Sequence, residues 1–231
     1  MKSTERRVIS VPVLMCILLA TFLMGCKSTE NLNPIQFEKQ DDQRLIRINI
    51  RDYGAVTFRL FTKQEPEVVA EFIERAKSGY YDGTSFFEMI DDYLVMGGRD
   101  DLQAGKKIEA AVDDGLYPFK GALCTNLSND GTCSLNSFYV ITLNQDELTN
   151  IEELVEHKGY TLLDYIKFGY KTELTEQELD SFRDFGGAPW LYGHTVVFGQ
   201  VIEGFEIFEL MIEKDNEDES NEFFIDSIET D

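Results

Sequence analysis

Histidine is nearly absent from this chain, which has only His157 and His194 among its 231 residues. None of the four cysteines forms a CxxC pair, so the ligand spacing typical of zinc sites and redox motifs is missing. The two histidines also stand far along the chain from the cysteines, which disfavours a Cys-His hydrolase. We therefore predict no metal site and no cofactor.

Positive charge is also scarce. The chain has 21 Lys and Arg against 43 Asp and Glu, which gives a formal net charge of −22. Such a protein repels the phosphates of nucleic acids, so we expect no nucleic-acid partner. The acidic residues are typical of a solvated surface, and we expect a monomer.

The chain has one long apolar run, Val11 to Met24, which is shorter than a comfortable transmembrane helix. Basic residues precede it, as they do in an export signal. The run closes in "LMGC", which resembles the lipobox of bacterial lipoproteins. That resemblance implies a signal peptide over residues 1–25 and a diacylated Cys26, which would hold the protein at the outer side of a bacterial membrane. An uncleaved anchor and plain secretion are the alternatives.

The remaining cysteines leave two possibilities open. Cys16 would leave with the signal, so Cys124 and Cys133 are the pair that stays in the folded protein. An exported protein can hold a disulfide across such a short loop. The alternative is a pair of half-buried thiols.

The rest of the chain divides into a polar segment and one domain. Residues 26–42 show almost no periodicity and predict a tether, while residues 43–231 are enough for one core. Apolar residues alternate in several short runs, and "EPEVVAEFIERAKSGYY" and "FEIFELMIEK" have helical spacing. Many short strands with two such helices predict a mainly β fold, a closed antiparallel barrel capped by helices. Residues of about 145–188 have a helical composition and predict an insertion, in which Thr175 and Glu178 form a capping box.

The order of these pieces resembles the cyclophilins. The blocks that carry the resemblance are "YYDGTSFFEMIDDYLVMGG", "GAL" with "SFYVIT", and "WLYGHTVVFGQVIEGFEIFELM". They follow one another from about Arg44 to Lys214, with the insertion between them. The resemblance implies an eight-stranded antiparallel barrel with a helix at each end. It also implies a peptidyl-prolyl cis-trans isomerase that acts on proline-containing segments of other polypeptides, here exported ones.

The resemblance implies a proline pocket with an apolar wall. Where the family has Phe-Met before the paired glycines, this chain has Tyr93 and Leu94, and Tyr139 takes the place of a phenylalanine. The substrate-binding residues predicted by this alignment are Phe86, Tyr93, Leu94, Met96, Tyr139, Trp190, Leu191 and Thr195. Met96 stands where the family has a glutamine. Thr195 stands where it has a histidine, and a shift of one residue would place His194 there instead.

The catalytic position differs most. Cyclophilins are understood to aim an arginine at the prolyl nitrogen, and Glu88 stands at that position. An ionised carboxylate has no proton to donate to the nitrogen lone pair. Arg99 and Lys120 are the nearest cations in these motifs, although no motif places them in the pocket. Two functions therefore remain, a weak isomerase that assists folding of exported proteins and a non-catalytic module that binds proline-containing segments.

Overall fold

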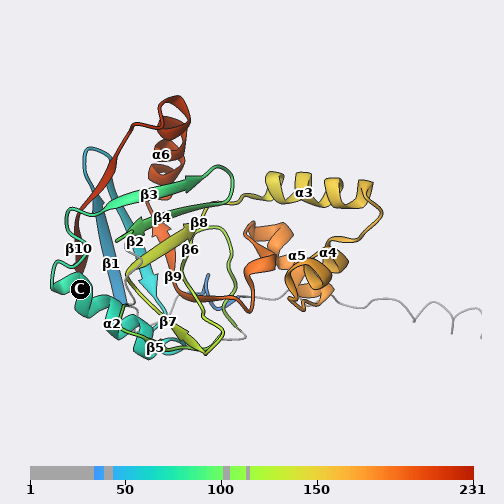
Figure 1. Ribbon diagram of the computed structural model, residues 1–231, viewed down its shortest axis with the longest axis horizontal. Coiled ribbons are helices and arrows are strands. Elements are labelled where there is room, and N and C mark those ends of the chain that lie inside the picture. The colour runs from blue at the N-terminus through green and yellow to red at the C-terminus, as the bar shows by residue number, and fades with distance from the viewer. Residues whose placement is uncertain (1–33, 39–43, 101–104, 113–114) are drawn as a thin grey trace, which may run out of the picture. The chain divides into compact units, whose positions relative to one another are not determined.

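The computed structural model describes residues 34–38, 44–100, 105–112 and 115–231, and these belong to one compact unit. Eight strands close into an antiparallel barrel in the order β1-β10-β3-β4-β8-β6-β9-β2, and β5 and β7 pair separately (Figure 1). The barrel strands are β1 (Arg44–Ile50), β2 (Gly54–Leu60), β3 (Ser85–Ile90), β4 (Leu94–Gly98), β6 (Ala122–Asn126), β8 (Ser137–Ile141), β9 (Thr195–Glu203) and β10 (Phe223–Thr230). The small sheet has β5 (Ile108–Glu109) and β7 (Thr132–Cys133). The predicted barrel is confirmed.

Two helices cover the barrel, α2 (Pro66–Lys77) and α6 (Glu206–Glu217), and they lie at opposite ends of it in Figure 1. Pro66 occupies the first turn of α2, where its missing N–H costs nothing. Phe72 of α2 and Phe208 of α6 are fully buried in the barrel core. Both helices therefore bury an apolar stripe at spacings that the sequence predicts.

Alternation along the strands separates two hydrophobic clusters. Val95, Phe138 and Phe198 belong to the cluster inside the barrel. Their neighbours along the strands, such as Leu94 and Tyr139, belong to a second cluster on the outer face. Because successive side chains of a strand point to opposite faces, β4, β8, β6 and β9 present an apolar surface on both sides.

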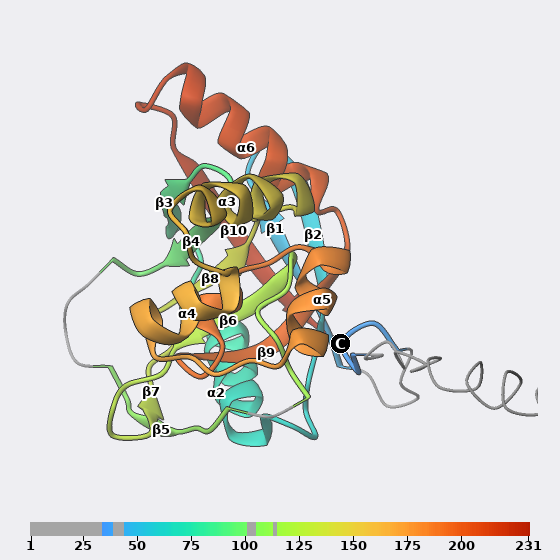
Figure 2. The same cartoon turned by 90° about the vertical axis from the view of Figure 1, so that its right-hand side faces the viewer.

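The inserted residues cover that outer face. They form α3 (Gln145–His157), α4 (Leu162–Tyr170) and α5 (Glu176–Phe185), followed by a short 3₁₀ helix, η1 (Pro189–Leu191). Ile166 and Phe182 are fully buried in the outer cluster, and Figure 2 shows the three helices in front of the strands. The predicted capping box is present, since Thr175 accepts from the Glu178 backbone N–H and the Glu178 carboxylate accepts from the Thr175 N–H. The insertion is thus part of the hydrophobic core.

The predicted tether over 26–42 is wrong for residues 34–38. Gln36 is fully buried; its side chain donates to Tyr117 O at 2.8 Å and to Gln200 Oε1 at 3.1 Å, and accepts from Tyr117 N at 2.6 Å. Arg59 donates to the Gln36 carbonyl at 2.7 Å, and the Phe37 ring stacks on Phe185 at 4.4 Å. This polar segment can pack against the domain because the domain supplies hydrogen-bond partners for the Gln36 side chain and carbonyl.

Both cysteines in the described residues are free, buried thiols. Cys124 lies in the outer cluster and Cys133 in the barrel core, so the structure has the thiol alternative and not the disulfide. Burial raises the pKa of the Cys133 thiol to about 11 and that of Cys124 still further.

The predicted signal peptide and the lipid-bearing Cys26 lie outside the described residues. Within the described part of the chain, no helix has the length and apolar character needed to span a bilayer.

Candidate functional site

A row of residues crosses the outer face of the barrel from β3 to β8. Glu88 on β3 pairs in register with Met96 on β4, and Met96 pairs with Tyr139 on β8. Exposure falls along this row: Glu88 is exposed, Met96 is half-buried and Tyr139 is buried. The row therefore runs from solvent into an apolar surface.

Aromatic side chains form the wall beside this row. The Tyr93 and Trp190 rings lie 5.9 Å apart between centroids, and Trp190 Nε1 donates to the Tyr93 hydroxyl at 3.1 Å. The Tyr93 backbone is fixed at both ends, since it donates to Ile90 O at 3.1 Å and accepts from Thr142 N at 2.9 Å. Leu191 follows Trp190 and is half-buried against the same outer cluster as Leu94. The structure thus brings together the predicted apolar residues of β4, β8 and η1.

A buried chain of hydroxyl groups holds the inner end of the row. The Tyr139 hydroxyl contacts Thr195 Oγ1, and Thr195 donates to Thr125 O at 2.9 Å. Burial raises the pKa of Tyr139 well above its ordinary value, so this phenol stays protonated. Thr195 is 1% exposed, whereas His194 is exposed and its Nε2 contacts Tyr170 O at 2.9 Å. Thr195, and not His194, thus lies at the inner end of the row, where it is bonded to Tyr139.

Phe86 does not line this surface. Its side chain is 3% exposed and packs inside the barrel against Phe138 and Phe208, so the prediction that it contacts substrate is wrong. The β3–β4 register shifts between Phe86 and Glu88, which turns Phe86 inward and Glu88 outward. A Cβ on Gly97 would lie 2.6 Å from the Phe86 ring, which explains the first of the paired glycines.

No described cation lies within ion-pair distance of Glu88. The Arg99 guanidinium donates to Tyr80 O at 3.0 and 3.2 Å and lies 4.5 Å over the Tyr80 ring. Lys120 pairs with Glu209 at 2.9 Å. Both candidate replacements for an arginine donor are thus bound to other groups.

Sequence reasoning missed the contribution of the insertion. The Tyr170 ring of α4 lies 6.0 Å from Trp190, and the Thr172 hydroxyl is within 3.2 Å of Trp190 O and 3.0 Å of Tyr192 O. The dense aromatic spacing of "GYTLLDYIKFGY" was the available signal. The insertion therefore supports the Trp190 side of the apolar wall.

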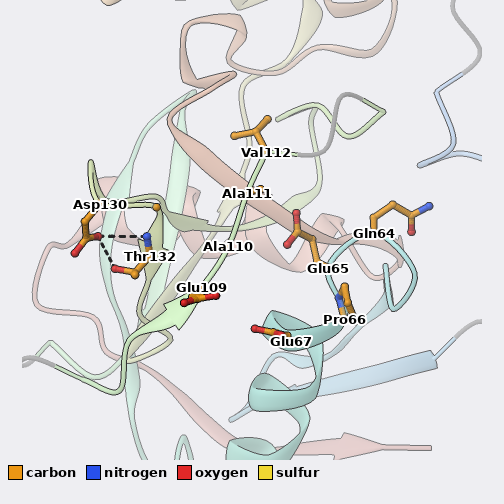
Figure 3. A pocket seen from close by; sticks show the side chains of 11 residues that line it. Gln64, Glu65, Pro66, Glu67, Glu109, Ala110, Ala111, Val112, Asp130 and Thr132 are labelled. Carbon is orange, nitrogen blue, oxygen red and sulfur yellow. Dashed lines mark hydrogen bonds between the residues drawn. The ribbon is translucent and has the colours of Figure 1, made fainter.

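A separate hollow lies elsewhere in the described structure. It has a volume of about 600 Å³, and Glu65, Glu67 and Glu109 face one another across it (Figure 3). Asp130 at its rim pairs with the Lys107 ammonium and accepts from Thr132, and these two contacts, Lys107 foremost, hold the pKa of Asp130 at about 2. No group of His, Cys, Asp and Glu in the described residues has the arrangement of a metal site. This hollow shares no lining residue with the row of Glu88.

The comparison with protein families decides what this barrel is. Residues 45–229 match the family model described as "Cyclophilin type peptidyl-prolyl cis-trans isomerase/CLD". The chain belongs to the cyclophilin-type peptidyl-prolyl isomerase family. The resemblance to that family places its catalytic arginine and its proline pocket along the row from Glu88 to Tyr139.

Relatives from staphylococci are also similar. A Staphylococcus haemolyticus (strain JCSC1435) protein is 28% identical over 182 residues, which cover 75% of this chain and 83% of that protein. A Staphylococcus aureus (strain USA300) protein is 28% identical over 179 residues, covering 73% and 82%. Both carry the name "Putative peptidyl-prolyl cis-trans isomerase".

Solved structures show the same fold. A cyclophilin-type isomerase from Cryptosporidium parvum superimposes with a TM-score of 0.54 at 17% identity, covering 82% of this chain and 98% of that one. A second structure of that protein, determined in the presence of the dipeptide Ala-Pro, gives 0.51 at 21% identity and covers 80% and 96%. These likenesses establish the cyclophilin barrel.

Proposed function

We propose that this cyclophilin is an exported protein, anchored by lipid on Cys26, that binds proline-containing segments of other exported polypeptides and isomerises them only weakly. The main support for this proposal is the exposed carboxylate of Glu88 beside the apolar wall that includes Tyr93 and Trp190. The related structure determined with Ala-Pro supports a proline ligand for this fold. The apolar wall would hold the proline ring.

Weak catalysis follows from the chemistry of the bond. Rotation about a peptide bond has a barrier of roughly 18–20 kcal/mol, and a donor to the twisted nitrogen lowers it. At this position Glu88 supplies an acceptor, which repels the same lone pair. Holding the substrate in a bent conformation would still contribute some rate.

A non-catalytic binding module is the second candidate. It is favoured by the commitment of Arg99 to Tyr80 and of Lys120 to Glu209, which leaves neither cation for the prolyl nitrogen. Binding and holding an unfolded segment needs the apolar wall and no donor. The two candidate functions therefore predict different isomerisation rates and the same ligand.

NMR exchange spectroscopy on a short Ala-Pro peptide separates these functions. We expect the full chain to shift the peptide resonances and to raise the cis-trans exchange rate slightly above the uncatalysed rate. Shifted resonances at the uncatalysed rate would establish the binding module. Fast exchange would contradict our assignment of Glu88, and unshifted resonances would overturn the proline pocket.

Mass spectrometry of the membrane-extracted protein tests the anchor. We expect a mature N-terminus at Cys26 with two acyl chains on its thiol. A chain that keeps residues 1–25, or one without lipid, would contradict the proposal.

A further inference from the structure

Aromatic rings connect the apolar wall to the surface of α4. Tyr93 contacts Trp190 at 5.9 Å, Trp190 contacts Tyr170 at 6.0 Å, and Tyr170 contacts Tyr165 at 5.8 Å between centroids. Phe168 stands three residues after Tyr165 on α4, so the two side chains share a helix face. The four rings from Tyr93 to Tyr165 form a continuous series, and Phe168 stands beside its outer end on α4.

The aromatic side chains at this outer end are unusually exposed for their size. Phe168 is 74% exposed, Tyr170 41% and Tyr165 38%. Single apolar side chains on a surface are ordinary, but adjacent exposed aromatics mark interaction sites. We call Tyr165, Phe168 and Tyr170 the aromatic strip.

Helix α4, which carries the strip, is anchored to the rest of the domain. Leu162 and Ile166 of α4 are buried in the outer cluster, and Thr161 caps its first turn by accepting from Asp164 N at 3.1 Å. His194 contacts the Tyr170 carbonyl, which ties the end of α4 to the segment before β9. A ligand therefore meets aromatic side chains that are already in place, which reduces the entropy cost of binding.

We propose that the aromatic strip extends the proline pocket and binds apolar residues that flank the proline in the same unfolded polypeptide. This inference rests on the proposed function. Three ring-to-ring steps of 5.8 to 6.0 Å separate Tyr93 from Tyr165, a path that an extended chain covers in about five residues. The flanking residues would thus lie about five positions from the proline.

The charge of the insertion indicates which polypeptide segments would bind. Residues 145–188 contain eleven Asp and Glu against four Lys and Arg, so the insertion as a whole would repel an acidic segment and attract a basic one. Next to the strip Lys167 pairs with Glu173 at 3.2 Å, so the attraction comes from the whole insertion. A second copy of this chain would bring a further net charge of −22 to the same surface. The favoured occupant is therefore an unfolded segment with aliphatic or aromatic residues and no carboxylates near its proline.

The single tryptophan of the chain makes the test direct, because Trp190 is the wall residue that contacts Tyr170 of the strip. Its fluorescence is titrated with two peptides: a tetrapeptide, Ala-Ala-Pro-Ala, and a longer peptide with Leu and Phe four to six positions from the proline and with basic ends. We expect the full chain to bind the longer peptide at least tenfold more tightly. A variant with Tyr165→Ala and Phe168→Ala should lose that advantage and keep the tetrapeptide affinity.

Leu154→Ala is the matched control, since Leu154 is 57% exposed on α3 and outside the strip. We expect it to bind both peptides as the unmodified chain does. Equal affinity of the unmodified chain for the two peptides, or an unchanged longer-peptide affinity in the double variant, would overturn the strip alone. Failure of the tetrapeptide to bind would overturn the proline pocket and the strip that depends on it. A strip that instead holds a second copy would appear as a dimer in sedimentation that the double variant dissociates, and that result also overturns the proposal.

Discussion

The Glu88 side chain stands beside Met96 across the β3–β4 ladder, where the two residues pair in register. The resemblance places an arginine and a glutamine at these positions in the family. In this chain Glu88 is an exposed hydrogen-bond acceptor, and Met96 is a half-buried thioether. Both polar contacts to the substrate backbone are thus replaced, while the aromatic wall next to them is kept.

Restoring the donor should restore catalysis. We expect Glu88→Arg to raise the Xaa-Pro exchange rate at least tenfold, because a guanidinium favours the twisted amide by at least about 1.4 kcal/mol. Adding Met96→Gln should raise it further. Glu88→Lys is the control, since an ammonium lacks the planar fork and should give a smaller gain. NMR exchange on an Ala-Pro peptide measures each rate, and an unmodified chain as fast as Glu88→Arg would contradict this prediction.

The Tyr93 hydroxyl should stabilise the fold through Trp190. Tyr93→Phe leaves the indole N–H without its acceptor, and the Trp190 side chain is only 8% exposed. We expect a loss of about 1–2 kcal/mol in the free energy of unfolding, measured by urea denaturation. Tyr160→Phe is the matched control, because Tyr160 is 57% exposed, and it should change stability by less than about 0.5 kcal/mol. Equal stability of the two variants would show that the bond contributes nothing.

Gln36 should contribute substantially to the free energy of unfolding, although it precedes the first barrel strand. Gln36→Ala removes three buried hydrogen bonds and leaves the Tyr117 backbone without these partners. Each buried group left unpaired costs about 1–3 kcal/mol, so we expect a loss of roughly 2–4 kcal/mol in urea denaturation. The control is Gln145→Ala, whose exposed side chain donates to Asp184 O. A Gln36→Ala chain as stable as this control would mean that the segment is not docked in solution.

The two thiols should be chemically inert in the folded protein. Burial raises the pKa of Cys133 to about 11, above the value of about 8.5 for an unfolded cysteine. A neutral buried thiol stabilises the fold below pH ~8.5, and this contribution is lost as the pH rises toward the folded pKa. For residues 27–231 we expect no reaction with Ellman's reagent at pH 8 and two reactive thiols in urea. Finding none in urea would indicate a disulfide between Cys124 and Cys133.

The barrel could be predicted because its signals are local. Ile46, Ile48 and Ile50 alternate as a strand requires, and the structure buries all three. The candidate pocket residues came from matching ordered motifs, and the structure brings Glu88 beside Met96 and Thr195 beside Tyr139. Phe86 was misplaced because a local register shift changes the face to which a side chain points, and composition carries no sign of it.

Contacts between distant segments could not be predicted in this way. Gln36 bonds to Tyr117 and Gln200, which are 81 and 164 residues away in the sequence. No periodicity links such positions, so a polar segment before the first strand predicts a linker. The ring contact of Tyr170 with Trp190 escaped notice for the same reason, because it depends on how the insertion folds back.

The docking of Gln36 also limits how far this protein would stand from its membrane. With lipid on Cys26, as we propose, a chain segment of eight residue-to-residue steps would connect the lipid to buried Pro34. A chain of that length reaches at most about 27 Å when fully extended. That reach is comparable to the width of a small domain, so the domain would work close to the headgroups.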